Sequence, residues 1–167
     1  RIGTLNRASR TDPLTGLLNR RGLQQALDAL QVQGIPFAIL ALDIDRFKSI
    51  NDAHGHDVGD AAIVHIADQM RRYSRDSDIL CRAGGEEFLL LLPGINAEPA
   101  RQAGERLRQH IADHPFEPVG TITVSLGVAH FPSFHVDAEQ ALRLADKALY
   151  MAKEQGRNRV VVYPYAD

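Results

Sequence analysis

Runs of hydrophobic residues along the chain predict its strands. The continuous apolar run from Phe37 to Leu42, bounded by Pro36 and Asp43, predicts a central strand that is buried on both faces. Two further runs, over residues 79–83 and 86–92, flank a Gly-Gly pair, and strands joined by two glycines predict a β-hairpin. Residues 121–130, rich in Val, Ile and Thr, and residues 159–163 predict the other strands.

Apolar positions at helical spacing predict the helices between these strands. Asp45 is placed to cap the second helix, and Gly34 and Gly156 to end the first and the last. Because hairpin-paired strands accompany helices packed elsewhere, the order of elements favours an α+β fold with a mostly antiparallel sheet. The predicted helices cover about residues 19–31, 46–52, 59–73, 98–114 and 137–155.

The length of 167 residues corresponds to one domain. Because the chain begins with Arg1 rather than Met, we expect a piece of a longer protein. Residues 1–11 would be the end of an upstream linker or signalling helix, broken at Thr11-Asp12-Pro13, and residues 12–167 the domain itself. The composition, 44% hydrophobic and 24% charged, is that of a soluble globular domain.

Charge and cysteine content narrow the choice of partners and compartment. The net charge of −2 lacks the basic excess of a duplex-binding domain, so we expect no nucleic-acid polymer as partner. The longest apolar run is far too short to cross a bilayer, and there is no signal peptide, so we expect no membrane contact by this fragment. A single cysteine, Cys81, fits a reducing compartment, and we expect a cytoplasmic domain, with any membrane anchor in an upstream sensor.

Two carboxylates stand out because each lies at the end of a predicted strand. Asp43 follows the apolar run, and Glu86 follows the two glycines of the hairpin. Carboxylates on adjacent strands repel each other unless a cation lies between them, and Mg²⁺ takes one or two carboxylates together with substrate phosphates. On spacing alone, however, the simpler explanation is favoured, in which Asp43 caps a helix and Glu86 is a solvated hairpin residue.

The neighbouring residues change this balance, because from Asp12 onward the chain resembles the GGDEF domain of diguanylate cyclases. Each motif alone is only modestly specific. All of them together, in this order and at this spacing, make the probability of a chance match very small. Residues 84–88, GGEEF, carry the signature with glutamate at its third position. The other matching motifs are residues 11–20 (TDPLTGLLNR), 43–52 (DIDRFKSIND), 55–60 (GHDVGD), 125–129 (SLGVA) and 145–159 (ADKALYMAKEQGRNR).

The resemblance implies a sheet wrapped by helices, related to the palm of polymerases and to nucleotide cyclases. It implies condensation of two GTP molecules into cyclic di-GMP with release of two pyrophosphates. In this reaction a ribose 3′-hydroxyl attacks the α-phosphate of the other GTP. Because each domain holds one GTP, two copies must meet face to face, so a homodimer is expected for catalysis.

The resemblance also assigns metal and catalytic roles. It implies that Asp43, Glu86 and the backbone carbonyl of Ile44 bind Mg²⁺, for which Mn²⁺ could substitute. Glu86 corresponds to the residue proposed as general base, although a carboxylate bound to a cation is a weak base. Lys48 corresponds to a residue that stabilises charge in the transition state, and a solvated lysine is the alternative. Glu87 is expected on the opposite face of the strand, where a structural role is equally open.

Three residues correspond to contacts with the substrate base. Asn51 and Asp60 match the guanine-reading pair, since an amide serves the acceptor edge of guanine and a carboxylate accepts from its N1 and N2 hydrogens. His56 matches a substrate contact in the same loop. Asp60 also lies in a predicted first helical turn, where an acidic residue is favourable in any protein.

Four residues correspond to contacts with the triphosphate. Gly84 and Gly85 allow the backbone to approach phosphates closely, and they also make the tight turn. Lys153 and Arg157 match the triphosphate-binding pair. Their alternative role is that of favourable cations at a helix C-terminus. Ala83 stands where the family more often has a larger residue, which affects local packing rather than chemistry.

An RxxD motif, Arg75-Asp76-Ser77-Asp78, ends six residues before Gly84. That position matches the inhibitory site of the family, where cyclic di-GMP binds away from the active site. A guanidinium can bind a phosphate or a guanine edge, and a carboxylate can accept from guanine. Arg106 is the candidate for a second contact, and an ordinary charged turn is the alternative.

Two other functions stay open on sequence. One is a module that binds GTP or cyclic di-GMP without turnover, although such domains usually lose signature residues and here the signature is complete. The other is an enzyme that condenses a different purine nucleotide, against which Asn51 and Asp60 argue.

Overall fold

The structure is a computed structural model and describes residues 9–131 and 137–163. Most of the segment expected as an incoming helix, residues 1–8, lies outside these ranges. No helix in the described ranges is both long enough and apolar enough to cross a membrane.

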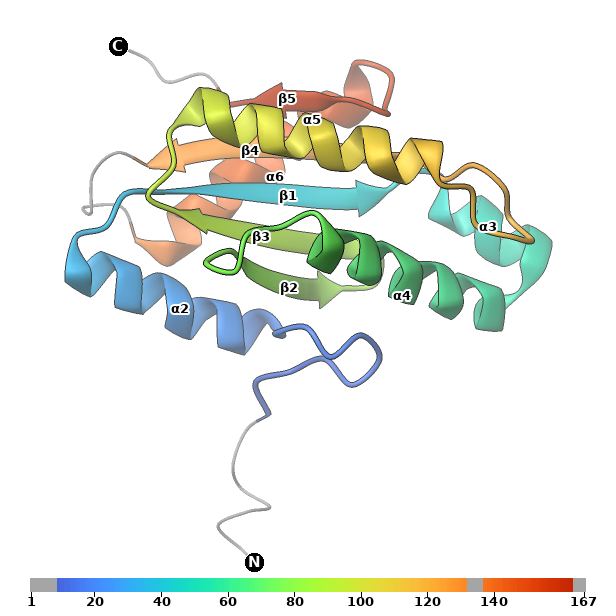
Figure 1. Cartoon of the computed structure of the whole chain (residues 1–167), viewed down its shortest axis with the longest axis horizontal. Helices are drawn as coiled ribbons and strands as arrows, with labels where there is room; N and C mark the ends of the chain where they lie inside the picture. Colours follow the sequence, from blue (N-terminus) through green and yellow to red (C-terminus); the bar gives the residue numbers. More distant parts are fainter. Residues whose placement is uncertain (1–8, 132–136, 164–167) are drawn as a thin grey trace, which may run out of the picture.

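A five-stranded sheet forms the centre of the described part of the chain, with the strand order β2-β3-β1-β4-β5 (Figure 1). The first strand in the chain, β1, lies in the middle and pairs antiparallel with β3 and β4. β2 and β3 form the predicted hairpin, and only the short edge strand β5 runs parallel to its neighbour β4. The strands are β1 (Phe37–Ile44), β2 (Ile79–Gly84), β3 (Glu87–Pro93), β4 (Val124–Phe131) and β5 (Val160–Val162).

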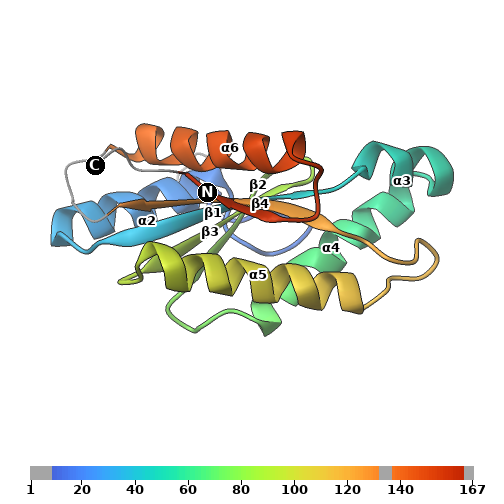
Figure 2. The same cartoon turned by 90° about the horizontal axis from the view of Figure 1, so that it is seen from above.

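Helices cover both faces of this sheet (Figure 2). α4 and α5 pack on one face and α2 and α6 on the other, each face with its own apolar core. α3 extends from the end of β1 and leads directly into α4. The helices are α2 (Arg20–Gln33), α3 (Phe47–His54), α4 (His56–Arg72), α5 (Ala97–Asp113) and α6 (Ala138–Glu154).

The continuous apolar run of β1 follows from this two-sided packing. Every residue of β1 is buried, and successive side chains point to opposite faces. Leu40 and Leu42 belong to the core beneath α4 and α5, whereas Ile39 and Ala41 belong to the core beneath α2 and α6. A strand with helices on both faces needs apolar residues at every position, which explains why no alternation is seen.

The predicted fold class, α+β with a mostly antiparallel sheet, is confirmed. Two local predictions are wrong. Asp45 does not cap α3, whose N-cap residue is Arg46 at φ 56°. The helix predicted from about residue 59 begins at His56, because Gly55 at φ 89° is the single residue between α3 and α4. Gly156 lies one residue beyond the C-cap of α6, which is Gln155.

Helix α6 approaches β4 so closely that the contact requires a glycine. A Cβ at position 127 would lie 2.1 Å from the backbone N of Leu149 and 2.6 Å from the carbonyl O of Ala145. Neither backbone atom can move without displacing the helix, so Gly127 sets the distance between α6 and the sheet.

We therefore expect Gly127→Ala to lower the free energy of unfolding by about 3 kcal/mol through overpacking. The matched control is Gly104→Ala in α5, where the new Cβ would meet only side-chain ends, those of Leu40 at 3.2 Å and of Leu126 and Val160 at 3.6 Å. The control should stay within about 1 kcal/mol of the wild type, since alanine also favours the helix. Urea unfolding measures both variants, and equal stability of the two would contradict this account of the α6–β4 contact.

Candidate active site

Asp43 is a carboxylate buried at the end of β1, with its side chain only 9% exposed. Its Oδ2 accepts a hydrogen bond from Lys153 of α6, whereas its Oδ1 is buried and has no hydrogen-bond partner. Burial raises the pKa of Asp43, the Lys153 ammonium opposes this rise, and the negative charges of Glu86 and Asp45 add to it. The net rise means that Lys153 alone does not fully compensate the buried charge.

Glu86 is brought to the same place by the hairpin turn. The backbone N of Ile44 donates to the carbonyl O of Glu86 at 3.3 Å, which joins the turn to the end of β1. The turn itself contains Gly84 at φ 155° and Gly85 at φ 52°, values that side chains other than glycine rarely allow. The predicted proximity of Asp43 and Glu86 on adjacent strands is therefore present.

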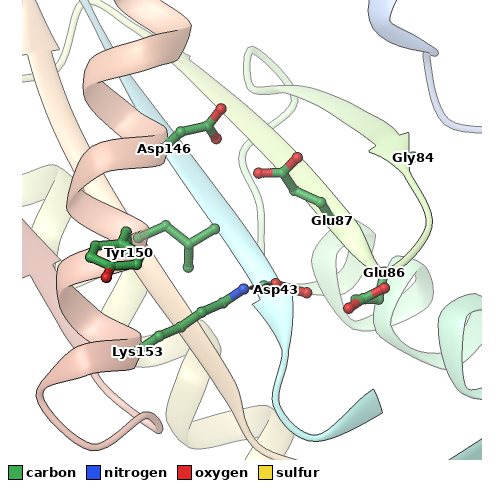
Figure 3. A pocket seen from close by; sticks show the side chains of 8 residues that line it. Asp43, Gly84, Glu86, Glu87, Asp146, Tyr150 and Lys153 are labelled. Atoms are coloured by element: carbon green, nitrogen blue, oxygen red, sulfur yellow. Dashed lines mark hydrogen bonds and ion pairs between the residues drawn. The ribbon is translucent and has the colours of Figure 1, made fainter. Parts of the chain in front are cut away.

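Two cavities meet at these carboxylates and share Asp43, Glu86 and Lys153. The smaller one, about 190 Å³, is here called the basic cavity, because cationic side chains from the α3 and α6 ends surround it. The larger one, about 350 Å³, is called the acidic cavity and lies between β3 and α6 (Figure 3). The basic cavity is further lined by Ile44, Asp45, Arg46, Phe47, Lys48 and Arg157, and the acidic cavity by Gly84, Glu87, Asp146, Leu149 and Tyr150.

The basic cavity has the features of an anion site. Lys153 and Arg157 both line it, although Arg157 follows the end of α6 in a left-handed conformation, at φ 64°. The N-terminus of α3 also faces it, and the cap residue Arg46 makes no side-chain capping bond there. The first backbone N–H groups of α3 are thus available to a phosphate. Lys48 lies at the rim, 89% exposed, with its ammonium 3.0 Å from Asp52.

Asp45 lines the basic cavity, but its hydrogen bonds stabilise the fold. Its carboxylate accepts hydrogen bonds from the hydroxyls of Thr123 and Ser125, each at 2.7 Å, and from the backbone N of Asn158 at 3.0 Å. These bonds fasten the end of β1 to β4 and to the turn after α6. They replace the helix-capping role expected from the sequence.

Glu87 and Asp146 line the acidic cavity, and neither was predicted there. Glu87 pairs in register with Asp43 on the neighbouring strand, so the two side chains share one face of the sheet. Glu86 precedes β3, and both glutamates line the acidic cavity at this end of the sheet, so the expected opposite orientation of Glu87 does not keep it away from the site. The signal for Asp146 was its spacing, seven residues before Lys153, which places both on one face of α6.

The surroundings of Glu87 strongly shift the pKa of its carboxyl group. Burial raises the pKa of Glu87 to about 8, and the hydrogen bond and negative charge of Asp146 add to this rise. Arg20, whose guanidinium lies 3.9 Å from Glu87, acts in the opposite direction. Figure 3 shows the two carboxyl groups directed toward each other across the acidic cavity.

The candidate guanine contacts come from α3 and α4. Asn51 lies against Gly59, since a Cβ at Gly59 would fall 1.8 Å from Asn51 Oδ1. That amide oxygen is buried and has no hydrogen-bond partner. Asp60, the next residue of α4, is exposed, as is His56 at the start of the helix. The structure thus places Asn51 and Asp60 on either side of one close helix–helix contact.

The RxxD motif forms a turn closed by its own charges. Arg75 Nε donates to Asp78 Oδ1 at 2.9 Å, and Asp78 Oδ2 accepts from the backbone N of Arg75 at 2.9 Å. Arg75 is 49% exposed, so its guanidinium remains accessible to solvent. Arg106 lies one turn before His110 on α5, and His110 stacks on Tyr73 at 3.7 Å, close to the start of the motif in the chain.

The residues at the shared carboxylates fit a hard divalent cation. Among residues 9–131 and 137–163, no group of three His, Cys, Asp or Glu side chains forms a complete metal site. Two carboxylates, one with an unpartnered buried oxygen, and the nearby carbonyl of Ile44 form an incomplete set of oxygen ligands. Mg²⁺ accepts such a set, because water and substrate phosphates complete its octahedron.

A mostly antiparallel sheet wrapped by helices, with two acidic strand ends beside a basic cavity, is the architecture of the palm-like class of domains. The model of the family described as "Diguanylate cyclase, GGDEF domain" matches residues 9–159. The chain therefore belongs to the GGDEF domain family of diguanylate cyclases, and the resemblance in its motifs is confirmed.

Several relatives and solved structures support this assignment. The chain is 39% identical to the response regulator PleD of Caulobacter vibrioides and 43% identical to the diguanylate cyclase DgcP of Pseudomonas aeruginosa, with 90% and 91% of this chain covered. The GGDEF domain of DgcB from Caulobacter crescentus, solved in complex with c-di-GMP, matches with a TM-score of 0.86 and 32% identity over 96% of each chain. An active GGEEF domain from Vibrio cholerae matches with a TM-score of 0.81 and 35% identity, over 90% of this chain and 99% of that one. The chain spans only 35% of PleD and 24% of DgcP.

The two buried aspartates at the end of β1 should differ in their effect on stability. The raised pKa of Asp43 means that its ionised form is disfavoured in the folded state, so its charge costs stability above that pKa and the cost disappears as pH falls. We expect Asp43→Asn to be as stable as the wild type at pH 7, or more so. Asp45→Asn should lose about 2 kcal/mol, because it leaves buried donors without an acceptor. Thermal unfolding measures both, and a large loss for Asp43→Asn would refute the argument.

Proposed function

We propose that this domain condenses two GTP molecules into cyclic di-GMP and releases two pyrophosphates. The observation that carries the proposal is the convergence of two acidic strand ends and a basic cavity at one point, within a GGDEF domain with a complete signature. The relatives named as diguanylate cyclases support the same activity. A homodimer is part of the proposal, because each domain has one such site.

The metal would be held by Asp43, Glu86 and the carbonyl of Ile44. We propose Mg²⁺, with Mn²⁺ as a substitute, since these oxygen ligands suit both ions. When bound, the ion would neutralise the triphosphate and the charge that develops on the transferring phosphoryl group.

The residues of the basic cavity would hold the triphosphate. Lys153 and Arg157 supply positive charge, and the first backbone N–H groups of α3 supply hydrogen bonds. Lys48, at the rim, is placed to approach the phosphates and stabilise the transition state once it leaves Asp52. Gly84 and Gly85 keep the hairpin turn free of side chains where the nucleotide passes.

Guanine would be read by Asn51, Asp60 and His56. The unpartnered buried oxygen of Asn51 can accept a hydrogen bond from the base, and the amide nitrogen can donate to an acceptor on its edge. The exposed carboxylate of Asp60 can accept from N1 and N2 of guanine. Adenine presents no such pair of donors on that edge, so this arrangement favours GTP over ATP.

In the reaction, the 3′-hydroxyl oxygen of one GTP forms a bond to the α-phosphorus of the other, and the bond to pyrophosphate breaks. The hydroxyl proton must leave during this step, and Glu86 is a carboxylate that lines both the basic and the acidic cavity. We assign to Glu86 the role of proton acceptor in addition to metal binding.

The test of the proposed function is incubation of the domain with GTP and Mg²⁺, followed by identification of the nucleotide product by mass spectrometry. We expect cyclic di-GMP, and a specific activity that rises with protein concentration. Asp43→Asn and Glu86→Gln should each reduce the rate on the order of a hundredfold or more while the domain remains folded. Asp113→Asn, an exposed carboxylate at the end of α5, is the matched control.

A folded wild type that binds GTP and makes no product would refute the enzyme and favour a binding module instead. Activity that survives in both carboxylate variants would remove the metal assignment.

We propose further that cyclic di-GMP inhibits the enzyme at Arg75 and Asp78, with Arg106 as a second contact. Support comes from the exposed guanidinium of Arg75 and from the c-di-GMP complex of the similar DgcB domain. Arg75→Ala should weaken c-di-GMP binding about tenfold to a hundredfold, the loss expected for a charge-assisted hydrogen bond. Calorimetry measures the affinity, and the activity without product should be kept.

Arg72→Ala, an exposed arginine three residues earlier, is the control for the loss of positive charge. If Arg75→Ala and Arg72→Ala bind c-di-GMP equally well, the inhibitory site lies elsewhere.

A further inference from the structure

The glycine turn that carries Glu86 is not held by packing. A Cβ built on Gly84 or on Gly85 would meet no atom within 4 Å, apart from those of its chain neighbours. Glycine is also the residue with the greatest backbone freedom. The conformation of this turn, and with it the place of Glu86, must therefore be fixed by hydrogen bonds.

The pairing of Gly84 with Glu87 closes the turn at its base, and Arg82 of β2 supplies further hydrogen bonds to it. Its Nε and Nη2 both donate to the carbonyl O of Gly85, at 3.0 and 2.8 Å. A guanidinium fork with two donors on one acceptor defines the direction of that carbonyl more strictly than a single bond does. On the side of β1, the backbone N of Ile44 donates a longer hydrogen bond, at 3.3 Å, to the carbonyl O of Glu86.

The same guanidinium is anchored on its other side by Asp12. Arg82 Nη1 lies 3.1 Å from Asp12 Oδ1, and both side chains are largely buried, at 16% and 14% exposed. The second oxygen of Asp12 accepts from the backbone N and the hydroxyl of Thr15, at 2.9 and 2.8 Å. Asp12 is thus fixed by its own turn and can fix Arg82.

The segment that contains Asp12 is itself docked on the sheet edge. The backbone N of Leu18 donates to the carbonyl O of Leu80, and the backbone N of Arg82 donates to the carbonyl O of Leu18. Leu17 is buried in the core beneath α4 and α5. From α4, the guanidinium of Arg71 donates to the carbonyl O of Thr15. The N-terminal turn of the domain therefore reaches the active-site turn through one arginine.

We propose that Arg82 is a positioning residue for the reaction, which holds the turn so that Glu86 stays at the end of β1, and that Asp12 acts through Arg82. The inference rests on the proposed function for its kinetic consequence only. The geometric part, that the turn is ordered by the Asp12–Arg82–Gly85 chain of hydrogen bonds, can be tested without any nucleotide.

The kinetic test compares Arg82→Gln, Arg82→Lys and Asp12→Asn with the wild type, at equal concentrations of folded protein established by circular dichroism. Displacement of Glu86 by about 1 Å should lower kcat for Arg82→Gln on the order of a hundredfold. KM for GTP should change little, because Arg82 lines neither cavity of the site. Arg82→Lys keeps the charge and loses the fork, so we expect only partial rescue.

A double-mutant cycle tests whether Asp12 acts through Arg82 or independently of it. If Asp12 acts through Arg82, the variant with both substitutions should be no slower than Arg82→Gln alone. Additive effects would show that Asp12 acts independently and would overturn that part of the proposal. Arg101→Gln removes the exposed ion pair with Glu98 on α5, and as the matched control it should leave kcat unchanged.

The geometric test measures backbone order parameters of residues 84–86 by NMR relaxation, in the purified domain without nucleotide. We expect rigid values near 0.85 in the wild type and values below about 0.6 in Arg82→Gln, with the strand residues of β1 unchanged. Unchanged order in the turn would overturn the proposal, whatever the kinetics show. If the wild type makes no cyclic di-GMP, the proposed function fails while this measurement still decides the role of Arg82.

Discussion

The burial of one negative charge, that of Asp43, is the constraint on which the rest of the site depends. β1 lies in the middle of the sheet with helices on both faces, so its last residues leave the core without reaching open water. A carboxylate in such a place is costly unless cations surround it. Lys153 on α6 compensates part of this electrostatic cost, and the raised pKa of Asp43 indicates that the compensation is incomplete. The fold thus creates a place where a further cation is electrostatically favoured.

Other features of the fold serve to keep this charge in place. Asp45, two residues beyond Asp43, fastens the end of β1 through hydroxyl and backbone donors of β4 and the turn after α6. Gly127 lets α6 approach β4 closely enough for Lys153 to reach across to Asp43. The two acidic positions therefore differ in their effect on stability. The donors around Asp45 stabilise its charge, whereas the charge of Asp43 costs stability and has its use only in the proposed metal site.

The elements of the fold could be predicted from the sequence because they follow from local patterns. The apolar run of β1, the paired glycines of the hairpin and the apolar stripe of α6 each determine their own secondary structure. The start of α4 at His56 is a local error, whereas the other errors concern contacts between distant parts of the chain. The partners of Asp45 lie 78 to 113 residues away, so its sequence context showed only a capping position. Asp12 and Arg82, 70 residues apart, likewise meet only in the folded sheet.

The division of charge across the shared carboxylates has a consequence for the direction of the proposed reaction. On one side lie the cations of the basic cavity, among them Lys48 and Arg157, which attract a triphosphate. On the other side lie Glu87 and Asp146, where the raised pKa of Glu87, about 8, keeps that carboxyl mostly protonated near pH 7, and neither side chain supplies positive charge to a triphosphate. A leaving pyrophosphate is therefore stabilised on the basic side. Because the attacking and leaving oxygens of phosphoryl transfer are roughly in line, the proposed reaction would bring the 3′-hydroxyl from the acidic side. A ribose carries no charge and needs no cations there, and in the proposed homodimer the second domain would present it.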